Sequence, residues 1–216
     1  YQIQPLPINS GVFSLVKDRF QDLIWIATDG QGVYLYSNPL YSIKSMVLSN
    51  YTEKIERPVR AIYLDDERTF WVGTKGNGIL KIYDYEFDKN ISDCRAEVLT
   101  TSNSALSSNA VYCFAKSHRN LLWIGDEEGL TYYSYREKRI KSIPIRIGNE
   151  DFKYIHDIYE TADSELWLAS VGMGVVKARI AGTPDNPVIV DAQRYIINDG
   201  ELGSNYFFTI YAENEA

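Results

Sequence analysis

The sequence of 216 residues is poor in cysteine and in basic side chains, and each shortage excludes a class of protein. Its two cysteines, Cys94 and Cys113, are too few for a disulfide scaffold. Lysine and arginine total 22 against 29 acidic residues, a net charge of −7, so the chain lacks the basic surplus that binds nucleic-acid phosphates. No apolar run reaches the roughly 18–20 residues of a membrane-spanning helix. The chain begins at Tyr1 without a signal segment, and we expect it to be part of a longer protein.

The motifs of common catalytic sites are also missing. No G-x-S-x-G, H-E-x-x-H or P-loop spacing occurs, and the two histidines, at 118 and 156, fall in an expected turn and an expected strand. Three acidic pairs resemble the paired carboxylates of a glycoside hydrolase, but they fall in turns or loops of different repeats, where solvated turn residues are the simpler interpretation. The pairs are Asp65-Asp66, Glu127-Glu128 and Glu150-Asp151. We therefore expect no catalytic residue, no metal site and no cofactor in this chain.

Four tryptophans mark an internal repeat. They lie at 25, 71, 123 and 167, spaced by 46, 52 and 44 residues, each in a short apolar phrase such as Leu-Ile-Trp-Ile-Ala-Thr. A glycine follows each tryptophan after six or seven residues and leads into an apolar or aromatic stretch. A V-x-x-I type pair precedes each tryptophan by 12 or 13 residues. Short segments of this composition, bounded by Gly, Asp and Asn, are typical of β-strands.

Each repeat therefore supplies four strands. Strand a holds the V-x-x-I pair, strand b the tryptophan, and strand c follows the glycine; strand d covers residues 41–48, 94–100, 140–147 and 188–197 in the four repeats. Strand b is apolar at consecutive positions, so both of its faces should be buried between similar sheets. Four short strands at a period of about 40–50 residues are typical of a propeller blade. We predict an all-β chain of four-stranded antiparallel β-propeller blades with the four tryptophans in the core.

The predicted blades have definite boundaries. They cover residues 12–48, 59–100, 111–147 and 155–197. Residues 1–8 should form a terminal strand d, and residues 205–213, which contain another V-x-x-I type pair, should form strand a of a next blade. These parts do not close a ring, so we expect the remaining blades elsewhere in the parent protein, as in a seven-bladed propeller. The turn between strands b and c is one residue shorter in the third blade, and we expect it to differ.

The recurring phrase V-x-x-I…D-x-x-x-x-L-W-I-G-T-x-x-G-G-L-x-x-Y resembles the two-component-regulator propeller repeat. Residues 105–111 and 201–207 are similar to the G-L-S-S-N-x-V linker that joins blades in that family. Three repeats depart from the phrase: Ala27 and Ala169 replace the usual glycine in the first and fourth, and Ser-His at 117–118 replaces the acidic turn of the third. We expect these departures to affect local turns and to leave the fold unchanged.

The resemblance implies the periplasmic sensor region of a hybrid two-component system of Bacteroides-type bacteria. In that family the propellers lie outside the inner membrane, and a transmembrane helix leads to a histidine kinase and a DNA-binding module, none of which falls within this chain. The usual signals are glycan breakdown products. The implied partners are therefore a glycan-derived ligand and the other blades of the parent, with a homodimer as one arrangement and membrane contact only through the parent's helix. A protein-interaction scaffold without a small ligand is the alternative.

The candidate binding residues follow from the expected propeller topology. In a propeller the d–a loops and b–c turns gather at one end of the channel that the a strands line, so a ligand placed there touches several blades. Arg60 and His156 share the position after the first member of the V-x-x-I pair. The residues at this end of the channel mix hydrogen-bond donors, acceptors and rings, which suits a neutral or acidic sugar. For any single residue, an ordinary solvated loop position is the simpler interpretation. The candidate ligand-binding residues are Arg60, Asn109, His156, Asn205, Asp29, Lys75 and Glu127.

Overall fold

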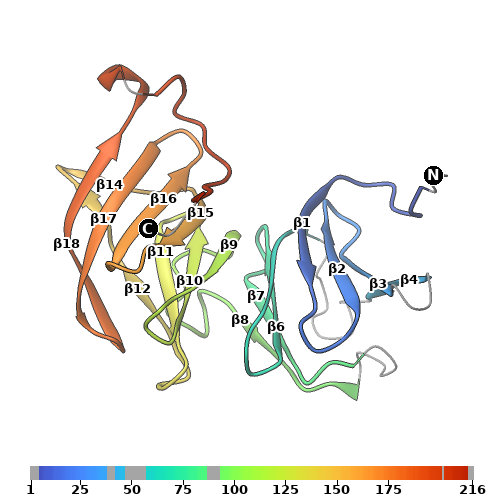
Figure 1. The fold of residues 1–216 in the computed structure, drawn as a ribbon. Helices are drawn as coiled ribbons and strands as arrows, with labels where there is room; N and C mark the ends of the chain where they lie inside the picture. Colours follow the sequence, from blue (N-terminus) through green and yellow to red (C-terminus); the bar gives the residue numbers. More distant parts are fainter. Residues whose placement is uncertain (1–4, 38–41, 47–56, 87–92, 201, 214–216) are drawn as a thin grey trace. The chain divides into compact units, whose positions relative to one another are not determined.

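The computed structural model describes residues 5–37, 42–46, 57–86, 93–200 and 202–213 (Figure 1). Its strands form four antiparallel sheets of four strands and one sheet of two strands, so the predicted all-β class with four-stranded blades is confirmed. Within these ranges no helix is long and apolar enough to cross a membrane. The chain divides into two compact units, Tyr1–Leu99 (unit 1) and Thr100–Ala216 (unit 2), and each is described by itself.

Unit 1 contains the first and second blades. In each blade every strand pairs antiparallel with the next one along the chain, in the order a-b-c-d. The first blade consists of β1 (Val12–Lys17), β2 (Leu23–Thr28), β3 (Val33–Ser37) and β4 (Ser42–Met46). The second blade consists of β5 (Val59–Leu64), β6 (Thr69–Thr74), β7 (Ile79–Tyr83) and β8 (Ala96–Leu99).

Unit 2 contains the third and fourth blades and one small hairpin. The third blade consists of β9 (Val111–Lys116), β10 (Leu121–Asp126), β11 (Leu130–Ser134) and β12 (Arg139–Ile143). The fourth consists of β15 (Ile155–Glu160), β16 (Glu165–Ser170), β17 (Gly174–Thr183) and β18 (Asn186–Tyr195), with β17 and β18 the longest strands (Figure 1). The predicted strand d at 140–147 is divided, because Pro144 has no N–H to continue the ladder. Beyond it, β13 (Arg146–Ile147) pairs with β14 (Glu150–Asp151).

A hydrophobic core lies between the two blades of each unit. In unit 1 the first blade contributes Trp25 and the second contributes Phe70, whose rings stack with centroids 3.8 Å apart. In unit 2 the third blade contributes Trp123 and the fourth contributes Leu168. All six residues of β6 and all six of β10 are buried. The prediction that strand b is buried on both faces is therefore confirmed for these two strands.

Three of the four repeat tryptophans are core residues, as predicted. Trp25, Trp71 and Trp123 expose at most 1% of their surface. Trp167 is only half-buried, because no other blade of unit 2 covers its face of the fourth blade. There its ring stacks on Tyr195, with centroids 6.0 Å apart. The position of the tryptophan in the repeat is thus constant, while its burial depends on the neighbouring blade.

In unit 1 a buried carboxylate at the a–b turn binds the indole of strand b. Trp25 Nε1 donates to Asp18 Oδ2 at 3.0 Å, and Trp71 Nε1 donates to Asp65 Oδ2 at 2.9 Å. The other carboxylate oxygen of Asp65 accepts the backbone N–H groups of Glu67 and Thr69. One acidic side chain therefore closes the hairpin and satisfies the buried indole N–H, which explains why the repeat phrase contains an aspartate before the tryptophan.

In the third blade, the indole N–H of strand b is bound by a residue of the next blade. Ser117 stands where the aspartate would be, and Trp123 Nε1 donates instead to Glu160 Oε2 of the fourth blade, at 2.7 Å. Arg119 lies beside this carboxylate, with Nε 3.9 Å from Glu160 Oε1, and its guanidinium also donates to Ile180 O. The expectation that the change at 117–118 affects only a local turn is therefore wrong, because it moves the acid into the interface between two blades.

The alanine substitutions in the repeat phrase lie in strands and not in turns, which corrects the sequence-based expectation. Ala27 and Ala169 are fully buried in β2 and β16. At the equivalent position of β10, a Cβ on Gly125 would meet Cys113 Sγ at 2.5 Å and Ile155 O at 2.6 Å. The residue type at this position is therefore set by how closely the neighbouring strand and blade approach it.

Within the described residues, the two predicted terminal segments contain no strand ladder. Residues 1–4 lie outside the described residues, and residues 5–8 are not in a strand. Pro5 and Pro7 cannot donate to a ladder. In the segment 205–213, the described pairing is one isolated bridge between Tyr206 and Val171. A strand a needs a strand b to complete its ladder, so a strand at 205–213 within a further blade stays a prediction.

The carboxylate of Asp65 should be worth far more to stability than that of its neighbour. Asp65→Ala leaves a buried indole N–H and two backbone N–H groups without an acceptor, so we expect the free energy of unfolding to fall by about 3 kcal/mol. Asp66→Ala is the matched control, because Asp66 is exposed and pairs with an exposed Arg19; it should cost less than about 1 kcal/mol. Urea unfolding followed by tryptophan fluorescence measures both, and equal losses would contradict the assigned role.

Gly125→Ala should destabilise unit 2. The added methyl would overlap a buried sulfur and a backbone carbonyl, so we expect a loss of about 2–3 kcal/mol. Gly203→Ala is the control, because an added Cβ there meets nothing within 4 Å. Thermal unfolding by circular dichroism compares the two variants, and an unchanged melting temperature for Gly125→Ala would show that the third and fourth blades do not approach as closely as described.

Candidate functional site

A repeated backbone hydrogen bond brings the d–a loop and the b–c turn together in every blade. The first residue of the b–c turn donates its N–H to the carbonyl of the residue before strand a. The bonds run from Asp29 to Gly11 (2.9 Å), Lys75 to Pro58 (2.9 Å), Glu127 to Ala110 (3.0 Å) and Val171 to Tyr154 (3.2 Å). Within each blade the two sets of loops therefore lie at one end, as the topology predicted. We call this the loop end.

The residue after the first member of each V-x-x-I pair is the extra residue of a β-bulge. In β5 the pairing passes from Val59 to Ala61 opposite consecutive residues of β6, and Arg60 is left out of the ladder. The same shift occurs at Phe13, Tyr112 and His156. A bulge re-aims a side chain out of the regular alternation of a strand. We call the bulge residues of the four blades, together with the equivalent Phe208, the slot residues: Phe13, Arg60, Tyr112, His156 and Phe208.

Within each unit the slot residues contact one another. In unit 1 the guanidinium of Arg60 lies 3.9 Å from the ring centroid of Phe13, a cation–π geometry. In unit 2 the rings of Tyr112 and His156 stack with centroids 4.2 Å apart and planes 17° apart, and Phe208 meets His156 edge-on at 5.5 Å. Arg60 and His156 were predicted as ligand-binding residues. The three aromatic members were missed, although they occupy the same position of the repeat.

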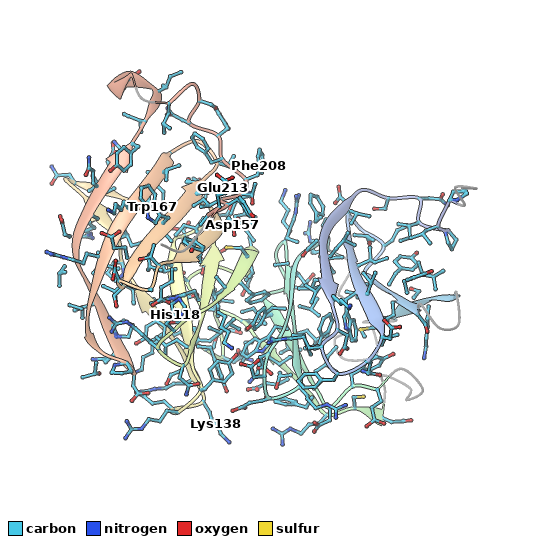
Figure 2. The ribbon with its side chains drawn as sticks, viewed as in Figure 1. His118, Lys138, Asp157, Trp167, Phe208 and Glu213 are labelled. Carbon is cyan, nitrogen blue, oxygen red and sulfur yellow. The ribbon has the colours of Figure 1, made fainter. Side chains whose placement is uncertain are left out.

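An aspartate holds the segment that carries Phe208. Asp157 Oδ2 accepts the Thr209 hydroxyl and the Ile210 N–H, both at 2.8 Å, and Phe207 N donates to Ser170 O. In Figure 2 the Phe208 and Asp157 labels lie together, while Lys138, in the turn between β11 and β12, lies at the other end of unit 2. Phe208 itself is 67% exposed, so its ring is available to a ligand while its backbone is fixed.

The two predicted asparagines organise their loops. Asn109 Oδ1 accepts the N–H of Thr101 at 2.9 Å, and Asn205 Oδ1 accepts the N–H of Ile197 at 2.8 Å. Each bond closes a loop over eight residues, so the asparagine of the linker phrase has the same structural role twice. A ligand contact by either side chain stays a prediction.

The other predicted residues lie in the b–c turns of three blades. Asp29 and Lys75 belong to unit 1 and Glu127 to unit 2. Glu127 is bound to its surroundings, because its carbonyl accepts the Tyr154 N–H at 3.0 Å and its Oε2 accepts the Ser108 hydroxyl at 3.4 Å. The structure therefore places the seven predicted residues at or near the loop ends of their blades, and brings Glu127 close to the d–a loops of unit 2.

The shorter turn of the third blade differs from the others, as expected. In the second blade Thr74 Oγ1 donates to Gly78 O and accepts the Asn77 N–H. In the third blade Asp126 stands at the same position, and one carboxylate oxygen accepts the N–H groups of Glu128 and Gly129. Burial raises the pKa of Asp126, and these hydrogen bonds only partly offset the effect.

A hollow of about 230 Å³ lies at the loop end of unit 2, between the b–c turn of the third blade and the β13–β14 hairpin. Two ion pairs line it: Lys153 with Glu128, and Arg146 with Asp151. The Lys153 pKa is raised by its hydrogen bond to Glu128. Phe152 adds an apolar surface. Such a combination of paired charges and an aromatic ring suits a polar ligand with an apolar face.

The described residues offer no arrangement for metal binding, since no three His, Cys, Asp or Glu side chains among them cluster closely enough to hold an ion. Among the acidic pairs that resembled hydrolase carboxylates, Asp65 is buried and binds Trp71, while Glu128 and Asp151 both line the hollow, and each forms an ion pair with a basic residue. His118 lies in the a–b turn of the third blade, away from the loop end.

Comparisons with known proteins identify the fold. No family model matches the chain. Among solved structures, the chain resembles the extracellular domain of BT3049 from Bacteroides thetaiotaomicron, a protein described as a hybrid two-component system, with a TM-score of 0.68 and 22% identity over 95% of this chain and 25% of that one. It also resembles PorZ, a surface component of the type-IX secretion system of Porphyromonas gingivalis, with a TM-score of 0.67 and 14% identity over 93% and 29% of the two chains.

A third similar structure is described as a β-propeller domain. The β-propeller domain of Cps50 (Swd1) from Myceliophteria thermophila matches with a TM-score of 0.57 and 14% identity over 87% of this chain and 61% of that one. The predicted β-propeller fold is thereby confirmed, and the description of BT3049 as a hybrid two-component system agrees with the class of system that the repeat phrase resembles. The chain spans only 25% and 29% of BT3049 and PorZ.

One curated protein is similar in sequence. Translation initiation factor 6 from Saccharolobus solfataricus is 30% identical over 148 residues, which cover 62% of this chain and 61% of that protein. The chain therefore spans less than two thirds of this relative, and more than a third of each sequence stays unmatched.

The buried Asp126 should make stability depend on pH. Its folded-state pKa lies above the unfolded value of about 4, so folding takes up a proton between the two values. Its contribution to the free energy of unfolding is then most favourable below about pH 4 and declines as the pH rises through the folded-state pKa. Asp126→Asn is neutral throughout. Urea unfolding across this range should show the wild-type protein losing stability relative to the variant as pH rises; a constant difference would contradict the assignment.

Proposed function

We propose that the chain is a non-catalytic segment of the periplasmic ligand-sensing region of a hybrid two-component sensor, and that it detects a glycan-derived oligosaccharide. Two findings support the sensor role: the four repeats resemble the two-component-regulator phrase, and the fold resembles part of the extracellular domain of BT3049. The kinase and the transmembrane helix would lie elsewhere in the parent protein, which would provide the only membrane contact. No nucleic acid would bind to this acidic segment.

The aromatic slot of unit 2 is the observation that carries the ligand proposal. Tyr112, His156 and Phe208 present rings from three successive strand-a positions. Sugars have apolar faces that pack on such rings and hydroxyls that bind polar groups nearby. The hollow of the same unit contains polar groups, including Lys153, and Lys153 precedes His156 by only three residues in the d–a loop.

Ligand binding would act by shifting a population. A glycan fragment that contacts several blades favours one arrangement of the sensor, and the size of the effect is set by its difference in affinity for the two arrangements. A homodimer of the parent would be one way to transmit that shift through the membrane. The b–c turns and slot residues are the parts of this chain that would make the differential contacts.

A protein-interaction scaffold is the second candidate, and the first blade provides the observation in its favour. Val12, Leu15 and Ile24 are 50%, 63% and 36% exposed, whereas the equivalent residues of the second blade are buried. Such a face needs an apolar cover. The cover we propose is another blade of the parent protein, which keeps the sensor proposal as the first choice.

Titration with saccharides tests the ligand proposal. We expect at least one member of an oligosaccharide panel to bind the ectodomain that contains this chain, and Phe208→Ala to weaken that binding about three- to tenfold by removing a stacked ring. Tyr112→Ala should have a similar effect, and His118→Ala, at the a–b turn, serves as the control. Isothermal titration calorimetry measures all three. Absence of heat with every saccharide, together with binding of a protein partner, would favour the scaffold.

A further inference from the structure

The second blade concentrates basic residues at its loop end in a way that the other blades do not. Three positions surround this end in every repeat: two residues before strand a, the slot, and the first residue of the b–c turn. In the second blade they are Arg57, Arg60 and Lys75. The first and third blades have no lysine or arginine at these positions, and the fourth has Lys153, which pairs with Glu128, beside the slot residue His156. Three cations are therefore gathered in a chain whose net charge is −7.

These three cations have no acidic partner among the described residues. Arg19 of the same unit, by contrast, forms an ion pair with Asp66. Arg57, Arg60 and Lys75 form neither an ion pair nor a side-chain hydrogen bond within the described part of the chain. Arg60 Nε is buried and has no hydrogen-bond partner. A buried donor without an acceptor is costly, and the described residues supply no acceptor to this atom of the Arg60 guanidinium.

The local structure brings the backbone segments that carry the three residues to one end of the blade. The Lys75 N–H donates to the carbonyl of Pro58, which ties the b–c turn to the residues between Arg57 and Arg60. The Arg57 side chain crosses over Gly76, where an added Cβ would lie 3.8 Å from its Cγ and 3.9 Å from its Nε. The guanidinium of Arg60 is held over the ring of Phe13.

The same turn contains an acceptor without a donor. Asn77 Oδ1 is buried and has no hydrogen-bond partner, although the Asn77 backbone N–H is bound to Thr74 Oγ1. A ligand with hydroxyl groups beside an anionic group would therefore find both a cationic site and an acceptor within one turn. Arginine binds oxyanions with two parallel hydrogen bonds, and this geometry distinguishes a carboxylate or sulfate from a neutral hydroxyl.

We propose that the loop end of the second blade binds the carboxylate or sulfate group of a small ligand through Arg60, Arg57 and Lys75. Arg60, stacked on Phe13, is the central contact, and Arg57 and Lys75 complete the positive field around it. The site lies within unit 1 and is separate from the aromatic slot of unit 2. It rests on the proposed function only for the source of the anion, which would be an acidic saccharide.

Calorimetry with three probes tests this site. D-galacturonate should bind the protein, and D-galactose, its neutral counterpart, should not bind at this site. Arg60→Gln should weaken galacturonate binding about tenfold or more, because it removes a charged hydrogen-bond donor. Lys75→Gln, on an exposed turn where folding is not at risk, should weaken it several-fold. Lys17→Gln removes one charge from the other end of β1 and is the matched control. Raising the ionic strength should weaken galacturonate binding further.

The outcomes separate this proposal from the proposed function. Inorganic sulfate is the third probe, and sulfate binding as tight as that of galacturonate, lost in Arg60→Gln, would support the anion site and exclude a sugar as the source of its specificity. Equal binding of galactose and galacturonate, unchanged in Arg60→Gln and Lys75→Gln, would overturn the anion site and leave the saccharide sensor standing. No binding of either anion would overturn the anion site alone.

Discussion

The backbone hydrogen bond between the b–c turn and the residue before strand a is the constraint on which the functional end depends. It occurs in all four blades with different residue types, because it uses only main-chain atoms. Each blade can therefore vary the side chains at this end without losing the position of the loops. The slot residue follows this accepting residue two positions later, on a β-bulge, and so its place at the loop end is fixed while its residue type differs from blade to blade.

The fold was predictable from the sequence because the residues that pack each blade recur at the same positions of every repeat. Tryptophan, glycine and the V-x-x-I pair recur in register, and period-two strands between turns follow from them. Interactions between one repeat and the next could not be predicted from the sequence. Glu160 satisfies Trp123 from the next blade, and Cys113 and Ile155 together demand Gly125. Neither relation has a local signal, since both depend on how closely two blades pack.

The site was predictable only in part. Arg60 and His156 were selected as polar residues at one repeat position, and the aromatic residues Phe13, Tyr112 and Phe208 at the same position were overlooked. A usable signal was present. Side chains alternate in a strand, so two buried residues spaced by three, as in the V-x-x-I pair, require an extra residue between them. The spacing itself therefore indicates the bulge, and the bulge identifies every slot residue.

The bond between Trp123 and Glu160 has a consequence for how such arrays evolve. Repeat proteins grow by copying and exchanging units, and a unit that satisfies its own buried groups can be moved freely. The first and second blades meet this condition through Asp18 and Asp65. The third blade does not, because its indole is completed by the unit that follows. A duplication or exchange of repeats would therefore have to carry the third and fourth blades together. Their order in the chain is constrained, because the third blade must be followed by a blade that supplies the acceptor.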